Sequence, residues 1–207
     1  GDHRDLHSFP TRRSSDLNAT IERLDDASEA ASALAAFIFA LRGIDASGGP
    51  RPGEHNFFRG VPLAMRDAET RAAIDELHGT IDAAAATEAW EAALRAPAWD
   101  GPPVWIHGDL SSGNLLALDG RLSAVIDFGG LGVGDPACDL IIAWDLFFGE
   151  SREAFRAALT VDDATWARGR GWALSQALIF IPYYRDTNPV GVASARHMIE
   201  QVLADQD

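Results

Sequence analysis

Lysine is absent from this chain of 207 residues, and cysteine occurs once, as Cys138. A single cysteine cannot form an intrachain disulfide, and it excludes a zinc site built from several thiolates. Long apolar runs are also missing: the stretches 140–148 and 172–184 are interrupted by polar residues or proline. Both fall short of the ~18–20 apolar residues that a membrane span needs. We therefore expect a soluble, cytoplasmic protein that does not contact membranes.

Basic residues are scarce relative to acidic ones. The 17 basic residues are all arginine and stand against 31 acidic residues, which gives a formal net charge of −14. This charge repels nucleic-acid phosphates and attracts cationic small molecules, although it is also typical of a surface that merely keeps a protein soluble. The apolar fraction of 47% and the charged fraction of 23% indicate an ordinary globular domain.

The first residues differ in pattern from the rest. Residues 1–17 have no helical or strand periodicity, and arginine and serine cluster at 12–15. We interpret this segment as a non-native scar of a fused library sequence and exclude it from the fold prediction. A transit peptide is the rival interpretation, but the acidic residues Asp2, Asp5 and Asp16 argue against it.

Helical periodicity dominates from residue 26 onward. Asp26 followed by Glu29 is a capping-box pattern, apolar residues then recur on one helical face, and Gly43 is placed to end the helix. A loop rich in glycine and proline follows over 45–60. Further helices are expected from Asp67 to Ile81, from Thr87 to a stop at Pro97, and over 135–148, 151–159, 163–181 and 192–203.

Strand signals are confined to the middle of the chain. Val104–Ile106 is a short apolar run, and Leu115–Leu118 and Leu122–Ile126 flank Asp119-Gly120, the strongest short hairpin signal. Strands and helices do not alternate as a parallel sheet requires. The predicted fold class is therefore α+β and mostly α-helical.

The residues that can carry chemistry lie between His107 and Asp139. The segment HGDLSSGN, from His107 to Asn114, precedes the hairpin, and Asp127-Phe-Gly follows it. Phosphoryl transfer needs a carboxylate, such as Asp109, that accepts a hydroxyl proton, and hard oxygen ligands that hold Mg²⁺. Because the tight turn folds the chain back, Asp127 is expected near Asn114, so that a base and two oxygen ligands converge on one cleft.

This pattern resembles the kinase signature, and in detail the aminoglycoside phosphotransferase family, whose loop reads H-G-D-x-x-x-x-N where protein kinases have H-R-D. The segment 134–140, GDPACDL, is also similar to that family's pattern. The resemblance covers about residues 18–204, and its specific part is Val104–Leu140. It implies a kinase-like C-terminal lobe over 18–207, with the catalytic loop and metal site in 104–140 and helical acceptor-site regions in 18–100 and 141–204.

The resemblance assigns a role to each residue of the motif. Asp109 would be the general base, Asn114 and Asp127 the Mg²⁺ ligands, and ATP or GTP the phosphoryl donor. Asp139 would brace the catalytic loop by hydrogen bonds, and His107 would pack beneath it. Taken singly, each aspartate could be a cap or turn residue and His107 a core histidine, but the two spaced motifs together favour function.

Three other motifs give weaker signals. Gly132-Val-Gly134-Asp-Pro-Ala137 formally fits a dinucleotide fingerprint, but no parallel strand with a ribose-binding acid follows it. The segment GDLSSG at 108–113 lacks the spacing of a hydrolase nucleophile, and no paired histidines suggest a transition metal. Cys138 lies among small residues and is interpreted as a packing residue.

The missing lysine bears on activity. Kinase-like enzymes place a lysine from an N-terminal lobe on the nucleotide phosphates, whereas here no glycine-rich hairpin precedes residue 100. We expect that the N-terminal lobe is missing and that the chain folds but phosphorylates little or nothing, because positioning can be worth ~7–11 kcal/mol. The intact parent is expected to transfer the γ-phosphoryl group of ATP to a hydroxyl of a small molecule, such as an aminoglycoside-like antibiotic.

The substrate is less well defined than the reaction. The resemblance implies acidic residues that face an amine-rich acceptor, and Asp145, Glu150, Asp162 and Asp186 are unranked candidates. The alternative function is a non-catalytic acidic module that binds a cationic small molecule. Magnesium-dependent nucleotide binding separates these two functions.

Overall fold

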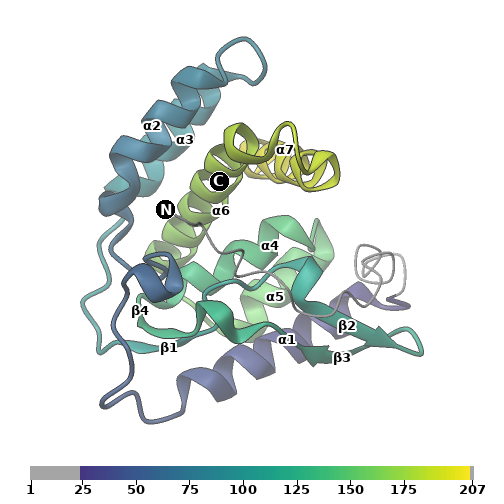
Figure 1. The fold of residues 1–207 in the computed structure, drawn as a ribbon. Helices are drawn as coiled ribbons and strands as arrows, with labels where there is room; N and C mark the ends of the chain where they lie inside the picture. Colours follow the sequence, from purple (N-terminus) through teal and green to yellow (C-terminus); the bar gives the residue numbers. More distant parts are fainter. Residues whose placement is uncertain (1–23, 206–207) are drawn as a thin grey trace, which may run out of the picture.

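The computed structural model describes residues 24–205, so the segment interpreted as a scar lies outside the described residues. Helices dominate this part, and two small antiparallel sheets lie on one side of it (Figure 1). This confirms the predicted class, α+β and mostly α-helical. The helices are α1 (Ala27–Arg42), α2 (Asp67–Glu76), α3 (Ala83–Arg95), α4 (Ile142–Asp145), α5 (Glu150–Leu159), α6 (Asp163–Tyr184) and α7 (Pro189–Ala204).

Helix α6 is central to the packing. It contacts α2, α3, α4 and α7, while α1 packs along α5 on the opposite side (Figure 1). Large buried side chains such as Trp90, Trp144, Trp172 and Phe155 fill the space between these helices. No helix among residues 24–205 is long and apolar enough to cross a membrane.

Helix α1 begins where the capping pattern predicts. The Asp26 carboxylate accepts the backbone N–H groups of Ser28 at 2.8 Å and Glu29 at 3.0 Å. The Glu29 side chain forms an ion pair with Arg121. Glu29 therefore ties the first turn of α1 to the strand that carries Arg121.

The boundaries of α2 and α3 differ from the prediction. Helix α2 ends at Glu76, five residues before Ile81, because a turn with Gly79 at φ 83° intervenes. Helix α3 begins at Ala83 after the N-cap Asp82, so Thr87 lies inside the helix. Asp67 does not cap α2; it lies in the first turn and accepts the indole N–H of Trp90 at 2.7 Å.

The helix expected over 135–148 is shorter and tighter. The chain winds as a 3₁₀-helix over Pro136–Ile141, and only Ile142–Asp145 is α-helical. A 3₁₀-helix and an α-helix share apolar contacts at a spacing of three residues, so the sequence pattern does not separate them. Helices α6 and α7 instead extend beyond the predicted limits, to Tyr184 and Ala204.

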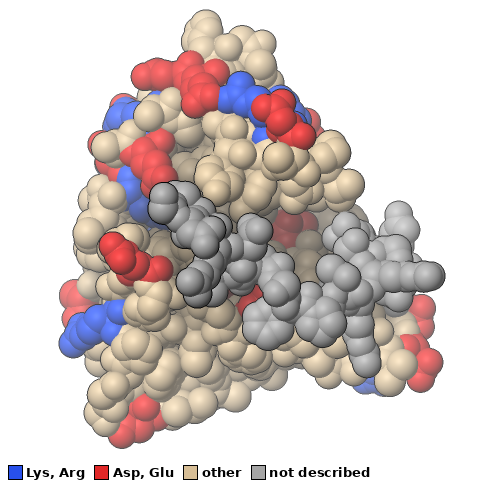
Figure 2. Space-filling view, in the orientation of Figure 1, with Lys and Arg blue, Asp and Glu red and all other residues tan. Residues whose placement is uncertain are grey.

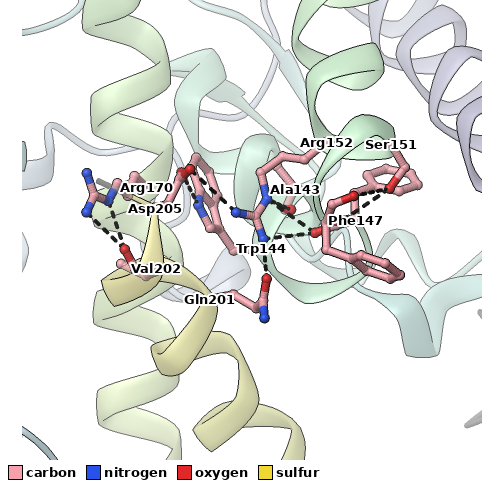
Figure 3. A network of polar contacts seen from close by, with 10 residues as sticks. Ala143, Trp144, Phe147, Ser151, Arg152, Arg170, Gln201, Val202 and Asp205 are labelled. Carbon is pink, nitrogen blue, oxygen red and sulfur yellow. Dashed lines mark hydrogen bonds and ion pairs between the residues drawn. The ribbon is translucent and has the colours of Figure 1, made fainter. Parts of the chain in front are cut away.

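The C-terminal helix is fastened by a buried arginine. The Arg152 guanidinium donates to the carbonyl groups of Ala143 at 2.9 Å and Phe147 at 3.0 Å, and to Gln201 Oε1 at 2.6 Å (Figure 3). In the same network the Trp144 indole donates to Asp205 at 2.8 Å. The Arg152 side chain of α5 thus provides hydrogen-bond donors for carbonyl groups at the end of α4 and also binds Gln201 of α7.

Each sheet contains two antiparallel strands. Strand β2 (Leu115–Leu118) pairs with β3 (Arg121–Val125) across a turn in which Asp119 and Gly120 have φ values of 50° and 75°. Two successive positive φ values are the hallmark of the type I′ hairpin that Asp-Gly predicts. Strand β1 (Val104–Ile106) pairs with β4 (Gly132–Gly134), a glycine-rich strand that strand propensity does not predict.

Candidate active site

The loop that follows β1 is held by a buried carboxylate. The two oxygens of Asp139 accept the backbone N–H groups of His107 and Gly108, each at 2.9 Å. Asp139 is fully buried, and burial raises the pKa of its carboxyl group, while these two N–H groups and Arg42 oppose the rise. The 3₁₀-helix that carries Asp139 therefore fixes the backbone at the start of the loop.

His107 joins the loop to the end of the hairpin. Its Nδ1 accepts the backbone N–H of Asp109 at 3.3 Å, and its Nε2 lies 3.1 Å from the carbonyl oxygen of Ile126. Because a backbone N–H can only donate, Nδ1 is the acceptor nitrogen of the ring, and Nε2–H donates to the carbonyl oxygen of Ile126. The buried ring also contacts Phe37 and Phe128, with ring centroids at 6.5 and 4.7 Å.

Two glycines bring the two motif segments into backbone contact. Gly108 has φ 78°, and a Cβ on it would lie 2.1 Å from the carbonyl oxygen of Gly130. A Cβ on Gly130 would lie 3.0 Å from the Gly108 carbonyl carbon and from the His107 carbonyl oxygen. The loop after β1 and the turn after β3 therefore cross with no side chain between them.

Asp109 and Asn114 lie side by side. The Asn114 amide Nδ2 donates to the Asp109 carbonyl oxygen at 2.7 Å and to its carboxylate Oδ2 at 3.1 Å. The side chain of Asp109 is 45% exposed, and its other oxygen, Oδ1, lies 4.0 Å from Nη2 of Arg59. Because Nδ2 faces Asp109, the amide oxygen of Asn114 is directed away from that carboxylate and is available as a ligand.

Asp127 reaches the same region through the backbone. Ile126 donates its N–H to the Asn114 carbonyl oxygen at 2.9 Å, so Asp127 follows directly after a residue bound to Asn114. Asp127 is exposed and has φ 61°, and its Oδ1 accepts the N–H of Gly129 at 3.3 Å. No hydrogen bond joins the Asp127 carboxylate to the side chains of Asp109 or Asn114 in the part of the chain that is described.

These donors suit a hard cation. Within residues 24–205, no three His, Cys, Asp or Glu side chains gather to hold a metal ion. An exposed carboxylate from Asp127 and the amide oxygen of Asn114 are ligands that Mg²⁺ accepts, and Mg²⁺ commonly completes its shell with water and phosphate oxygens. The residues present therefore fit the magnesium ion that the family resemblance implies.

Arg59 also lies at this site, although no motif in the sequence marks it as a site residue. It belongs to the loop expected over 45–60, and its Nη2 lies 4.0 Å from Asp109 Oδ1. The side chain is 14% exposed, and its Nε and Nη1 atoms are buried without a hydrogen-bond partner. A contact between two loops that are 50 residues apart leaves no local pattern in the sequence, so the position of Arg59 beside Asp109 was not predicted.

The glycines of β4 explain how the Arg59 loop comes so close. Asp135 donates its N–H to the Gly60 carbonyl oxygen at 2.9 Å, and a Cβ on Gly134 would lie 2.5 Å from that oxygen. A Cβ on Gly132 would lie 2.6 Å from Asn56 Nδ2. The Gly-x-Gly pattern thus serves close packing of the loop against β4, in agreement with the rejection of a dinucleotide fingerprint.

The four unranked acids occupy different environments. Asp145 accepts the backbone N–H of Ser112 at 2.6 Å, and burial raises the pKa of its carboxyl group. Asp145 therefore holds the loop at Ser112, whereas Asp139 holds it at His107 and Gly108. Asp162 caps α6 through the N–H of Thr165 at 2.6 Å, and Glu150 and Asp186 are exposed.

The mostly helical body, the short hairpin and the glycine crossing together define a kinase-like fold of the kind seen in small-molecule phosphotransferases. A family model described as the phosphotransferase enzyme family (APH) matches residues 3–172, so the chain belongs to this family. The matched range includes most of residues 1–17, and the interpretation of that segment as a scar stays a prediction.

Individual relatives agree with this assignment. Aminoglycoside 3'-phosphotransferase of Escherichia coli is 38% identical over 60 residues, which is 29% of this chain and 22% of that protein. The structure of the GDP and kanamycin complex of APH(2")-IIia superposes with a TM-score of 0.64 at 18% identity, over 95% of this chain and 70% of that one. A macrolide 2'-phosphotransferase type I gives a TM-score of 0.55 at 17% identity, over 87% of this chain and 61% of that one. The two solved structures show the shared fold.

Proposed function

We propose that this chain carries the phosphoryl-transfer site of an ATP- or GTP-dependent phosphotransferase that acts on a hydroxyl of a small molecule. The observation that supports the proposal most is the contact between Asn114 and Asp109, with Nδ2 at 2.7 Å from the carbonyl oxygen and 3.1 Å from the carboxylate. This contact directs the amide oxygen of Asn114 away from the Asp109 carboxylate, while Oδ1 of Asp109 faces Arg59 at 4.0 Å on a side chain that is 45% exposed. Proton acceptance and metal binding need these two groups.

In this proposal Asp109 accepts the proton of the acceptor hydroxyl while Asn114 and Asp127 hold Mg²⁺. The metal supplies positive charge that neutralises the nucleotide phosphates. His107, Asp139 and Asp145 do not touch the reacting atoms. They fix the loop backbone through the hydrogen bonds to Asp109, Gly108 and Ser112.

Nucleotide binding provides the test of this site. By isothermal titration calorimetry, we expect the chain to bind ATP or GTP only with Mg²⁺ present, and Asp127→Asn to weaken binding about tenfold or more. Asp119→Asn is the matched control, because it removes one negative charge from the same hairpin and asparagine tolerates the left-handed backbone at that position. Equal binding in EDTA, or unchanged binding by Asp127→Asn, would contradict the proposal and favour the non-catalytic acidic module.

We further propose that this chain turns over little nucleotide, since none of its 207 residues is a lysine that could hold the nucleotide phosphates. A coupled assay of nucleotide consumption with a hydroxyl acceptor tests this directly. Appreciable turnover that Asp109→Asn abolishes would refute the low activity and would at the same time support the role of Asp109. In a fully active enzyme, loss of the general base costs about 10²–10⁴ in rate.

A further inference from the structure

An open cleft of about 690 Å³ begins at Arg59, the residue beside Asp109. This volume is within the range of small-molecule sites, roughly 300–1,000 Å³. The loop before α2 forms one wall and the C-terminal turns of α6 form the other. Arg59 both lines the cleft and lies 4.0 Å from Asp109, so only the Arg59 side chain would separate a molecule in the cleft from the proposed base.

Both walls present aromatic side chains. Phe57 and Phe58 are 71% and 48% exposed, and Tyr183 is 77% exposed. On α6, the Tyr184 ring lies 4.3 Å from Phe180 and 4.5 Å from Tyr183, measured between centroids. Exposed apolar groups gathered in one concave place mark a binding site more often than isolated ones do.

The backbone holds the two phenylalanines in an unfavourable conformation. Phe57 and Phe58 have φ values of 54° and 56°, which non-glycine residues seldom adopt, least of all twice in succession. The buried Asn56 fixes this turn by donating from Nδ2 to the Arg59 carbonyl oxygen at 3.1 Å, and Phe58 donates its N–H to Gly53 at 2.9 Å. Such strain is characteristic of ligand-binding segments, where it is maintained by the surrounding structure.

The charge in the cleft is balanced, unlike that of the whole molecule. Arg59 and Arg66 line it, and Arg66 is anchored by donating from Nε to Ser175 Oγ at 2.8 Å. The pKa of Arg66 is lowered, chiefly by burial and also by the positive charge of Arg59. Glu54 and Glu69 are exposed at the rim. A molecule with several amines would meet two cations inside the cleft, whereas a single amine could pair with the rim.

We propose that this cleft binds the acceptor, and that the acceptor is a hydroxyl-bearing molecule with a large apolar ring surface and at most one positive charge. Phosphorylation of the hydroxyl of this bound molecule rests on the proposed function. It assigns Phe57, Phe58 and Tyr183 to the apolar face of the acceptor, and Arg59 to the junction with Asp109.

Calorimetric titration without nucleotide tests the cleft by itself. The probes are erythromycin, a macrocyclic lactone with one amino sugar, and kanamycin, a polycation. We expect erythromycin to bind at least about tenfold more tightly than kanamycin, with little change between 50 and 300 mM NaCl, because apolar contacts are not screened by salt. Phe57→Ala and Tyr183→Ala should each weaken erythromycin binding about fivefold.

Phe39→Ala is the matched control, because Phe39 on α1 is 72% exposed and does not line the cleft. It should leave binding unchanged. Tighter binding of kanamycin, absence of erythromycin binding, or equal effects of Phe39→Ala and Phe57→Ala would overturn the proposal. The nucleotide titration and the erythromycin titration have independent outcomes, so the two proposals are tested separately. If erythromycin binds but no nucleotide binds, the assignment of the cleft stands and the proposed phosphoryl transfer is refuted.

Discussion

At the scale of single residues, the glycine between His107 and Asp109 has a specific steric task. Its positive φ of 78° and its position against the Gly130 carbonyl oxygen leave no room for a Cβ, whereas protein kinases have arginine at this place in the motif. Gly79 provides a comparison within the same chain, because it has φ 83° and nothing within 4 Å of its Cβ position.

We expect Gly79→Ala to lower the free energy of unfolding by about 1–2 kcal/mol, the cost of left-handed backbone for a residue with a Cβ. Gly108→Ala should cost at least ~2 kcal/mol more, because backbone atoms of the 128–130 turn must also shift. Urea denaturation of both variants measures the difference. Equal losses would show that the glycine crossing is looser than described.

The second residue-scale prediction concerns Asp139. Asp139→Ala leaves the N–H groups of His107 and Gly108 buried without an acceptor, so the free energy of unfolding should fall by about 2–5 kcal/mol. Asp186→Ala is the control, because Asp186 is exposed and should change stability by no more than ~0.5 kcal/mol. A similar effect of the two substitutions in urea denaturation would contradict the bracing role.

Cys138 gives a pH-related prediction. Burial raises the pKa of its thiol to about 12, so the thiolate is almost absent near pH 8. In the unfolded chain the pKa returns to its ordinary value of 9.0. Iodoacetamide at pH 8 should therefore label the protein in urea and leave the native protein unlabelled over the same time, as measured by mass spectrometry. Rapid native labelling would show that the thiol is accessible, contrary to its role in packing.

Some of these residue contacts follow from the sequence and others do not. The five-residue spacing of Asp109 and Asn114 already predicts a shared loop, and the structure joins their side chains. The contact of Arg59 with Asp109 was not predictable, because it depends on how a loop folds over β4. Whether the Asp127 carboxylate turns toward Asn114 is likewise set by a backbone conformation, φ 61°, that the sequence does not specify.

At the scale of elements, a buried ion pair links α6 to the chain after β4. Arg168 and Asp135 are each 4% exposed, and their closest N and O atoms are 2.8 Å apart. Asp135 also caps the 3₁₀-helix through the N–H of Ala137 at 2.9 Å. One carboxylate thus joins the central helix, the strand that supports the Arg59 loop and the helix that carries Asp139.

Removal of one partner would leave the other buried and uncompensated. Arg168→Met should lower the free energy of unfolding by about 3–5 kcal/mol. Because Asn at position 135 has no charge to bury, Arg168→Met combined with Asp135→Asn should cost less than the sum of the single changes. Additive losses in a double-mutant cycle by urea denaturation would show that the two groups do not interact.

Element boundaries were predictable where a local signal exists. The Asp26 cap and the Asp119-Gly120 turn act within a few residues, and both are where the sequence places them. The start of α3 and the 3₁₀-helix after Asp135 were not predicted correctly. In the first case Asp82 offers a cap that the apolar pattern does not show, and in the second the tighter winding preserves the same apolar spacing.

At the scale of the whole molecule, acidic side chains lie along the outer edge of one face together with a few arginines, and broad areas carry no charge (Figure 2). The net charge of −14 implies repulsion that opposes folding at low ionic strength. This global charge and the balanced charge of the cleft are separate properties, and only the first can be read from composition.

Salt should therefore stabilise the protein. Between 20 and 200 mM NaCl we expect the Tm to rise by about 2–4 °C, which corresponds to about 1 kcal/mol for a chain of this size. Differential scanning calorimetry checks the direction and the size of the shift. A Tm that falls with added salt would indicate that attractive ion pairs outweigh the net repulsion.

The crossing of Gly108 and Gly130 has a consequence for anyone who wishes to re-engineer the protein. The backbone of Gly108, directly before the proposed base, and the backbone of Gly130, after the hairpin, approach so closely that neither residue has room for a Cβ, and no side-chain rotamer changes this separation. Variation of side chains elsewhere will therefore leave this backbone contact unchanged. A change of this backbone contact requires a substitution at one of the two glycines, or insertion or deletion of residues.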